Sequence, residues 1–414
     1  MIDTHAFAIF LYNLTLLPVI FFSVLFFLLA FINIFATKKP AQKFARLAEL
    51  PFISVQIPTY NDPVAARCIR QCMQFDYPED KFEIIIADDS TNKETQKTLR
   101  KFAQKHPSWI KYIHRNNRQG FKPGALKNAM KITRGEIIVV FDSDWIPRKN
   151  FLRKIVRPFS DPKIAIVQAS QGIYNKNKNN ITRFAAYLLT VYHSIIMPIN
   201  NRINCVFFCG TAGAIRRSAF DEVGGWNLDS LTEDSDLSVR LLFAGYRTIY
   251  LDIIVPSEVP DTFEGFVKQQ MRWCYGNARV FFDNATKILF GRGISLRQRL
   301  MIIFITLGNF AAPVVILMTI FGFTGWFLGD PTLFTTSDML AFIVKFTYTS
   351  GFLAIGTLAL YKRKLLGDFP LFLLTAMTVG LILSVANSIA FTRAIFNRKL
   401  SWFCTPKATN AKFI

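Results

Sequence analysis

One uninterrupted apolar run near the N-terminus constrains the fold of this chain more than any other feature. Residues 7 to 36, "FAIFLYNLTLLPVIFFSVLFFLLAFINIFA", carry no charged side chain. About 20 apolar residues already suffice for a helix to cross a hydrocarbon core of roughly 30 Å. The run lacks the basic segment and the small-residue cleavage site that mark a signal peptide. We therefore expect a retained membrane helix.

Three more apolar runs lie late in the chain, at residues 300 to 328, 339 to 360 and 369 to 391. The composition agrees with membrane insertion, because 51% hydrophobic residues and 42 Phe in 414 residues are high for a soluble protein. The long segment between the first run and the others has the composition of a soluble domain. The pattern predicts five parts in order: a transmembrane helix (1–37), a soluble domain (38–262), amphipathic interface helices (263–299), transmembrane helices (300–392) and a basic tail (393–414).

Basic residues around the apolar runs predict the orientation in the membrane. Lys and Arg follow the first run in "TKKPAQKFAR" and precede the second in "GRGISLRQR", whereas "GDPTLFTTSD" contains neither. Because cytoplasmic loops are enriched in Lys and Arg, we expect an integral protein of a plasma or inner membrane with its central domain in the cytoplasm. The last run breaks the alternation, since "YKRK" before it and "TRAIFNRKLSWFCTPK" after it are both basic. Either the tail is external, or residues 369 to 391 form a re-entrant or interfacial helix.

The net charge of +21 bears on the partners of the chain. A soluble protein of this charge would suggest nucleic acid, but these basic residues lie beside the apolar runs, and no RNA- or DNA-binding pattern is present. Membrane lipids and a phosphorylated substrate are the expected partners, and nucleic acid is not. Cys68 and Cys72 are spaced C-x3-C without a nearby histidine, which does not favour zinc. We interpret them as small hydrophobic residues.

From residue 52 onward, short β-rich runs alternate with helical segments, which is typical of a parallel α/β sheet. Helices are expected at 64–75, at 93–105 and in "GALKNAMKIT". The expected strands are "FISVQIP", "FEIIIADD", "IKYIHR" and "GEIIVVFDSD". Because ligands bind beyond the carboxyl ends of the strands in such sheets, the residues that follow each strand are candidates for a site.

The residues after the expected strands suit phosphate and a metal ion. They read "PTYND", "DDS", "RNNRQGFKPGA" and "DSD", and each loop alone could be an ordinary turn. Four such loops at one edge predict a nucleotide site, in which Asp88 can accept from a base N–H and Lys122 can meet phosphate. Asp142 and Asp144 directly follow an apolar strand and would hold a cation that bridges a diphosphate. Oxygen ligands of this kind suit Mg²⁺ or Mn²⁺.

Other patterns restrict the class of protein further. No G-x-G-x-x-G or P-loop motif occurs, which argues against a dinucleotide cofactor or a P-loop ATPase. "TED" places Glu233 and Asp234 at the start of an expected helix, where acids commonly complement the helix N-terminus. "FEGFVKQQMRWCYGNARV" is amphipathic, which is typical of an interfacial helix. "FFCGTAGAIRRSAF" offers small residues for close backbone approach.

Taken together, the ordered motifs "DDS", "DSD", "TED" and "QQMRW" resemble those of the membrane-embedded family-2 glycosyltransferases. That group contains the cellulose, mannan and hyaluronan synthases and ceramide glucosyltransferase. The resemblance covers residues 50 to 280 and extends to "LSVANSIAFTRAIF" and "FCTPK". It implies a GT-A type, Rossmann-like mixed α/β sheet domain inserted between N-terminal and C-terminal transmembrane helices.

The resemblance also implies which residues bind the donor and its metal. Asp142 and Asp144 would serve the diphosphate and a Mg²⁺ or Mn²⁺ ion. "FKPGAL" resembles a donor-site loop usually written K-A-G-A-L, from which Pro123 is a departure. The residues that would hold the nucleotide sugar are Thr59, Asp88, Asp89, Lys122, Asp142, Gln269 and Arg272.

The remaining motifs are implied in catalysis and in acceptor binding. Asp234 would be the catalytic base with Glu233 beside it, and Trp273 and Thr232 would face the acceptor. The implied reaction is an inverting transfer of a sugar from a UDP- or GDP-linked donor to a growing β-linked polysaccharide, which then crosses the membrane. The base takes the proton of the acceptor hydroxyl while the cation offsets charge on the leaving diphosphate.

Two alternatives remain open from the sequence. A single sugar could be transferred to a membrane lipid, as ceramide glucosyltransferase does, because Q-x-x-R-W occurs in both subgroups. Four membrane segments form a narrow channel at best, unless the chain forms a homo-oligomer. A receptor that only binds a nucleotide sugar would be expected to have lost the base, whereas Asp234 is present.

Overall fold

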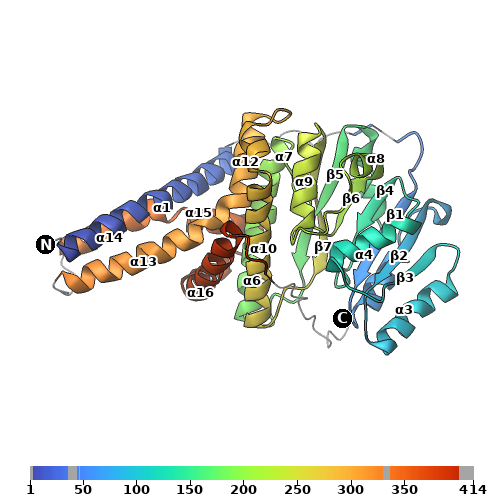
Figure 1. Ribbon diagram of the computed structural model, residues 1–414, viewed down its shortest axis with the longest axis horizontal. Helices are drawn as coiled ribbons and strands as arrows, with labels where there is room; N and C mark the ends of the chain where they lie inside the picture. The colour runs from blue at the N-terminus through green and yellow to red at the C-terminus, as the bar shows by residue number, and fades with distance from the viewer. Residues whose placement is uncertain (1–2, 36–43, 46, 330–335, 401–414) are drawn as a thin grey trace.

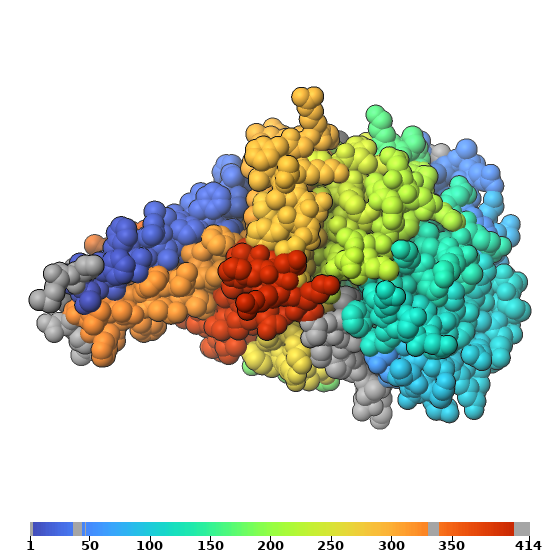
Figure 2. Space-filling view, viewed as in Figure 1, coloured from blue at the N-terminus to red at the C-terminus, as the bar shows by residue number. Residues whose placement is uncertain are grey.

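The computed structural model describes residues 3–35, 44–45, 47–329 and 336–400 of the chain. The molecule is elongated, with an α/β domain at its wide end and a bundle of apolar helices at its narrow end (Figure 1). The space-filling view shows the same division, with α10, α12 and α16 packed between the two ends (Figure 2). The helices of the narrow end are α1 (Thr4–Phe35), α13 (Ala311–Leu328), α14 (Thr336–Thr349) and α15 (Gly351–Lys362).

A seven-stranded mixed sheet forms the core of the α/β domain, in the spatial order β3-β2-β1-β4-β6-β5-β7. Strand β6 is antiparallel to both of its neighbours, and the other pairs are parallel. This arrangement confirms the predicted mixed GT-A type sheet. The strands are β1 (Ile53–Thr59), β2 (Phe82–Asp88), β3 (Ile110–His114), β4 (Ile137–Val140), β5 (Ile164–Ile173), β6 (Gly213–Arg216) and β7 (Arg247–Ser257).

Helices cover both faces of the sheet, so that β1, β2 and β4 are buried along their whole length. Their continuous apolar sequences follow from this, since a strand covered on both faces has no solvent side to alternate with. Cys68 and Cys72 are fully buried in this core with free thiols, as small hydrophobic residues would be. The helices of the domain are α2 (Ala65–Cys72), α3 (Lys93–Lys105), α4 (Phe121–Ala129), α5 (Phe151–Ile155), α8 (Arg217–Glu222) and α9 (Glu233–Phe243).

A layer of helices joins the sheet to the apolar bundle (Figure 1). Its members are α6 (Asn180–Val191), the π-helix η4 (Tyr192–Ile196), α7 (Met197–Arg202), α10 (Phe263–Asp283), α11 (Ala285–Phe290), α12 (Leu296–Leu307) and α16 (Phe369–Ile395). Short 3₁₀ turns complete the described chain at η1 (Glu79–Lys81), η2 (Met130–Ile132), η3 (Arg157–Ser160), η5 (Gly308–Phe310) and η6 (Leu366–Asp368). The amphipathic segment with Q-x-x-R-W is thus a single 21-residue helix, α10.

The predicted apolar runs are helical wherever the structure describes them. Within the described residues, three helices are long and apolar enough to cross a membrane: Thr4–Phe35, Leu296–Leu328 and Leu366–Ile395. Met339–Thr349 and Gly351–Lys362, bent by 58° at a short break, make a fourth if they form one span. Of the predicted loop "GDPTLFTTSD" at residues 329–338, residues 330–335 lie outside the described residues and Thr336 already begins α14. The end of the basic tail at 401–414, including Cys404, also lies outside them.

The last apolar helix, α16, contacts other helices of the joining layer near both of its ends. The ring of Phe372 packs edge-on against that of Tyr187 in α6, with centroids 5.8 Å apart. Near the other end, Nη1 of Arg279 in α10 donates to the carbonyl oxygen of Ala394 at 3.1 Å. We take the interfacial alternative, in which both basic segments that flank this helix stay on one side, as the prediction to test, although Leu366–Ile395 is also long and apolar enough to cross a membrane.

This topology predicts a specific pattern of cysteine labelling. The start of α1 lies beside the end of α13, with Nδ1 of His5 2.9 Å from the carbonyl oxygen of Gly325. We therefore expect an impermeant thiol reagent to label Asp3→Cys on intact cells, and to label Lys93→Cys and Arg398→Cys only after permeabilisation. Labelling of Arg398→Cys on intact cells would mean that α16 spans the membrane, and labelling of Lys93→Cys would invert the orientation.

Candidate active site

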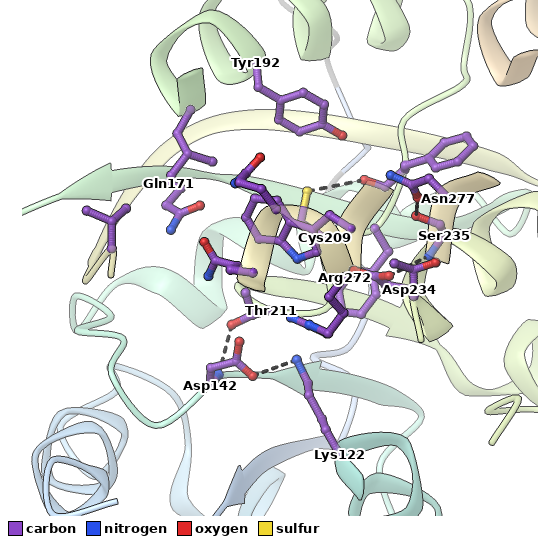
Figure 3. A pocket seen from close by; sticks show the side chains of 18 of the residues that line it. Lys122, Asp142, Gln171, Tyr192, Cys209, Thr211, Asp234, Ser235, Arg272 and Asn277 are labelled. Carbon is purple, nitrogen blue, oxygen red and sulfur yellow. Dashed lines mark hydrogen bonds and ion pairs between the residues drawn. The ribbon is translucent and has the colours of Figure 1, made fainter. Parts of the chain in front are cut away.

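A cavity of about 840 Å³ lies at the carboxyl edge of the sheet (Figure 3). Its walls come from the loops after β1 and β4, from the starts of α4 and α9, and from one face of α10. All predicted site residues except Asp88 line it. They are Thr59, Asp89, Lys122, Asp142, Asp144, Thr232, Glu233, Asp234, Gln269, Arg272 and Trp273.

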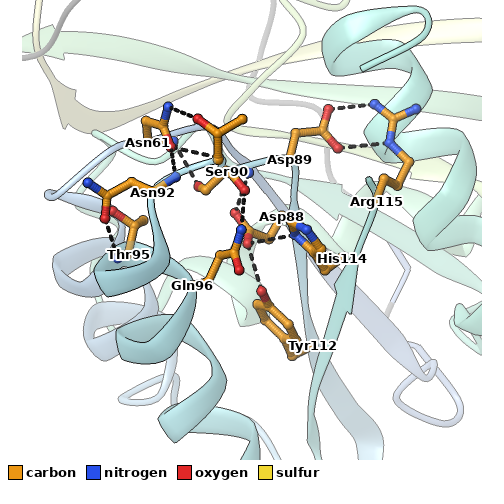
Figure 4. Close-up of polar contacts among 11 residues, drawn as sticks. Asn61, Asp88, Asp89, Ser90, Asn92, Thr95, Gln96, Tyr112, His114 and Arg115 are labelled. Atoms are coloured by element: carbon orange, nitrogen blue, oxygen red, sulfur yellow. Dashed lines mark hydrogen bonds and ion pairs between the residues drawn. The ribbon is translucent and has the colours of Figure 1, made fainter. Parts of the chain in front are cut away.

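Asp88 lies behind this wall and is 1% exposed. Its Oδ2 accepts from the Tyr112 hydroxyl at 2.7 Å and lies 3.1 Å from Nδ1 of His114, while Oδ1 accepts from the N–H of Ser90 at 3.0 Å (Figure 4). The acid of this loop that reaches the cavity is Asp89. The contact of Asp88 with a nucleotide base therefore stays a prediction.

Lys122, in the first turn of α4, brings a positive charge to the centre of the acidic loops. Its Nζ lies 2.7 Å from Oδ1 of Asp142 (Figure 3). It also lies 4.0 Å from Oε1 of Glu233 and donates to the carbonyl oxygen of Gly210 at 2.9 Å. Burial by itself lowers the pKa of Lys122, but the carboxylates of Asp142, Glu233 and Asp234 together outweigh burial and the pKa is raised. The ammonium group thus stays charged, which suits it to a phosphate.

Asp142 and Asp144 differ in their surroundings. The Asp142 side chain is 32% exposed, whereas Asp144 is buried and its Oδ2 accepts from the N–H of Glu258 at 3.0 Å. Among the described residues, no three acidic, His or Cys side chains gather closely enough to hold a metal by themselves. Mg²⁺ at phosphate sites is usually bound by one or two carboxylates together with substrate phosphates. The donor set therefore fits a cation that is completed by the diphosphate of a substrate.

Glu233 and Asp234 open α9, and Lys122 contacts both Glu233 and Asp142. Burial raises the pKa of Glu233 to about 7, and the charge of Asp234 adds to the effect. Burial also raises the pKa of Asp234 above its ordinary value, although Lys122 opposes this. A carboxylate with a raised pKa is a better proton acceptor. A helix-start role is present too, because Oδ1 of Asp234 accepts from the N–H of Ser235 at 2.8 Å.

The helix α10 packs tightly on the loop that carries "TED". Nη1 of Arg272 donates to the carbonyl of Leu231 at 3.4 Å, directly before the motif. One turn later, a Cβ at Gly276 would lie 2.4 Å from Cγ2 of Thr232, so only glycine allows this approach. The Q-x-x-R-W residues that consequently line the cavity are Gln269, Arg272 and Trp273.

Tyr60 and Arg118 also line the cavity, and neither was predicted as a site residue from the sequence, although both lie in the loops after expected strands. The guanidinium carbon of Arg118 lies 3.3 Å from the ring centroid of Tyr60, a cation–π contact. The Nε of Arg118 is buried without a hydrogen-bond partner in the described part of the chain. Only the fold shows that "PTYND" and "RNNRQG" meet in this way at the cavity wall.

Gly210 confirms the expectation of close backbone approach in "FFCGTAGAIRRSAF". Its φ is +74°, and a Cβ there would lie 2.9 Å from Oδ2 of Asp234 and 3.2 Å from Nζ of Lys122. A side chain at this position would displace the carboxylate of Asp234 and the ammonium group of Lys122. The glycine therefore lets the backbone pass directly behind both groups.

Gly210→Ala is expected to lower turnover by about 10²-fold, because a displacement on the order of 1 Å at reacting groups costs that much. Gly245→Ala is a matched control, since Gly245 has a φ of +84° but nothing within 4 Å of an added Cβ. Turnover of both variants should be compared at equal amounts of folded protein. Equal losses would show that backbone strain, and not contact with the site, is the cause.

The raised pKa of Glu233 predicts a pH-dependent stability. Because the folded pKa is about 7 against an ordinary 4.5, the folded protein holds a proton that the unfolded chain releases. This contribution is full below about pH 4.5 and is lost as the pH rises through 7, by at most about 1.4 kcal/mol per pH unit. Thermal unfolding of the ligand-free protein should therefore show a smaller decline from pH 5 to 8 for Glu233→Gln than for the wild type. Parallel declines would contradict the assignment.

Comparison with known proteins identifies the class of enzyme that has this fold and the family to which the chain belongs. A mannosyltransferase from Pyrobaculum calidifontis, PcManGT, solved in complex with GDP-Man and Mn²⁺, superposes with a TM-score of 0.64 and 18% identity over 96% of this chain and all of its own. The molecule therefore has the GT-A architecture of glycosyltransferases. The model of the glycosyl transferase family group 2 matches residues 137–391. The chain belongs to this family.

Curated relatives are similar to the chain at a higher identity. Glucomannan 4-beta-mannosyltransferase 2 of Arabidopsis thaliana is 33% identical over 268 residues, which are 62% of this chain and 50% of the relative. Glucomannan 4-beta-mannosyltransferase 1 of Cyamopsis tetragonoloba is 32% identical over 277 residues, covering 64% and 52%. The chain spans about half the length of the curated relatives it matches.

Proposed function

We propose that this protein is an inverting mannosyltransferase that moves mannosyl residues from GDP-mannose to a growing β-1,4-linked polysaccharide. The observation that carries the proposal is one cavity that holds a buried acid pair, a lysine and the Q-x-x-R-W face of α10. The similarity to glucomannan 4-beta-mannosyltransferases supports the sugar and the linkage. The GDP-Man in the solved enzyme of the same fold supports the donor.

In this proposal Asp234 accepts the proton of the acceptor hydroxyl as its oxygen attacks the anomeric carbon of the donor. The bond from that carbon to the diphosphate oxygen breaks on the opposite face, so the configuration inverts and GDP leaves. Lys122 and Arg272 offset the charge that develops on the leaving diphosphate. Trp273 supports the acceptor ring with its aromatic face.

A divalent cation, Mn²⁺ or Mg²⁺, fits beside these groups. Asp142 and Asp144 would hold it together with the donor diphosphate, where it supplies positive charge to the leaving group. The Mn²⁺ in the solved mannosyltransferase is consistent with this choice. The ammonium group of Lys122 lies 2.7 Å from Oδ1 of Asp142, so it is placed to contact the same diphosphate.

The cavity also suggests a route for the product. Beyond the Q-x-x-R-W face, its lining continues to Phe26 of α1, Phe304 of α12 and Phe352 of α15. We infer that the polysaccharide leaves between these helices, with the catalytic domain on the cytoplasmic side. A wider passage would require a second copy of the chain. Transfer of a single sugar to a lipid has no comparable support, because the relatives are named for a polysaccharide product.

The proposal is tested with purified protein in lipid, Mn²⁺ and a panel of radiolabelled GDP- and UDP-sugars. We expect incorporation from GDP-mannose into a product that grows with time on a sizing gel and is degraded by an endo-β-1,4-mannanase. Incorporation from UDP-glucose but not from GDP-mannose would exclude GDP-mannose as the donor. A product that carries a single mannose and is extracted with the lipids would exclude a polysaccharide as the product.

A further inference from the structure

Asn277 is a cavity residue that no sequence motif singled out. It lies one turn beyond Trp273 on α10 and lines the cavity. The close packing that Gly276 permits brings it beside Ser235, the residue that follows Asp234. A polar side chain of the acceptor-side helix is therefore attached directly to the segment that carries the proposed base.

The side chain of Ser235 contacts the amide oxygen of Asn277. The Ser235 hydroxyl donates to Oδ1 of Asn277 at 2.8 Å, and the Ser235 N–H donates to Oδ1 of Asp234 at 2.8 Å (Figure 3). Because Oδ1 of Asn277 is engaged, the amide nitrogen Nδ2 is the end left for the cavity. No described residue accepts a hydrogen bond from it. It offers N–H donors to a ligand beside the base.

We propose that Asn277 is a specificity-determining residue that donates a hydrogen bond to a second oxygen of the acceptor sugar. This inference rests on the proposed function, because it concerns the acceptor of that reaction. Asp234 accepts the proton of the attacking hydroxyl, and Asn277 holds a neighbouring hydroxyl of the same ring. A ring that only stacked on Trp273 could rotate in its plane, and the second hydrogen bond removes that freedom.

The test pairs variants of the protein with altered acceptors. The acceptors are a β-1,4-manno-oligosaccharide and two analogues whose non-reducing terminal mannose lacks the 3-hydroxyl or the 6-hydroxyl. The wild type should lose about tenfold in kcat/KM with one analogue, which corresponds to one hydrogen bond. The kcat/KM of Asn277→Ala with the complete acceptor should be about tenfold below that of the wild type. With that analogue, the kcat/KM of Asn277→Ala should fall no further. The affinity for GDP-mannose should stay within twofold of the wild type.

Asn277→Asp separates recognition from packing. It keeps the size of the side chain and the contact with Ser235, but it replaces the donor N–H₂ by an acceptor oxygen. We expect the kcat/KM of Asn277→Asp with the complete acceptor to be as low as that of Asn277→Ala. Near-wild-type kcat/KM for Asn277→Asp, or additive losses of Asn277→Ala with both analogues, would overturn the inference. Absence of mannosyl transfer by the wild type would instead refute the proposed function.

Discussion

Asp234→Asn should lower turnover by about two to four orders of magnitude, which is the usual contribution of a general base. Asn keeps the shape of the side chain but cannot accept the acceptor proton. Binding of GDP-mannose should be nearly intact, because the proposed diphosphate ligands Lys122 and Asp142 belong to other loops. Nucleotide affinity and turnover should be measured on the same folded preparation.

The competing account is that Asp234 only complements the start of α9, where it accepts from the N–H of Ser235. Because the amide oxygen of Asn can accept from the same N–H as the carboxylate of Asp, that account predicts near-normal turnover for Asp234→Asn and would then replace ours. Trp273→Ala provides a contrast. Loss of its aromatic face should weaken acceptor binding while donor binding is retained.

Removal of divalent cations should reduce transfer by at least about 10³-fold, since a metal at the leaving group supplies several kcal/mol and each 1.36 kcal/mol is a factor of ten. Added Mn²⁺ or Mg²⁺ should restore it. Asp144→Asn should resemble the metal-free enzyme at ordinary metal concentrations. The measurement is initial rate against free metal concentration, with a chelator preloaded with Mg²⁺ as control.

Asp236→Asn is a matched substitution for the metal experiment. Asp236 is also a buried acid, but it pairs with Arg240 at 2.8 Å and does not line the cavity. Its metal dependence should equal that of the wild type, whatever it loses in stability. Undiminished transfer in excess chelator would end the assignment of Asp142 and Asp144 to a metal.

The parts of the fold that could be predicted are the segments whose own sequence indicates one type of secondary structure. "FEIIIADD" and "GEIIVVFDSD" are apolar runs that end in acids, and they form β2 and β4. Strand β6 (Gly213–Arg216) reads "GAIR", which is not a continuous β-branched run like that of β4, and it forms because β4 and β5 pair with it. Packing also determines two further features, the bend between α14 and α15 and the π-helix at Tyr192–Ile196. The amino-acid composition of these segments does not predict either of them.

The site shows the same limit at the level of single residues. The acids of "DSD" directly follow β4, and because strand ends in such a sheet converge, their position at the site could be predicted. The acids of "TED" open α9 and follow no strand, so their place in the cavity was implied only by the family resemblance. Motif spacing could not decide between Asp88 and Asp89, since successive side chains of a strand point to opposite faces. Asn277 was missed because its significance comes from contact with Ser235, which lies 42 residues away in the sequence.

The most direct test of the central claim is an experimental structure of Asp234→Asn with GDP-mannose and Mn²⁺. We predict that the diphosphate lies in the cavity beside Lys122, with the metal at about 2.1 Å from a carboxylate oxygen of Asp142 or Asp144. The anomeric carbon should face position 234 with room for an acceptor hydroxyl between them. A donor bound outside this cavity, or a metal that contacts neither aspartate, would contradict the account.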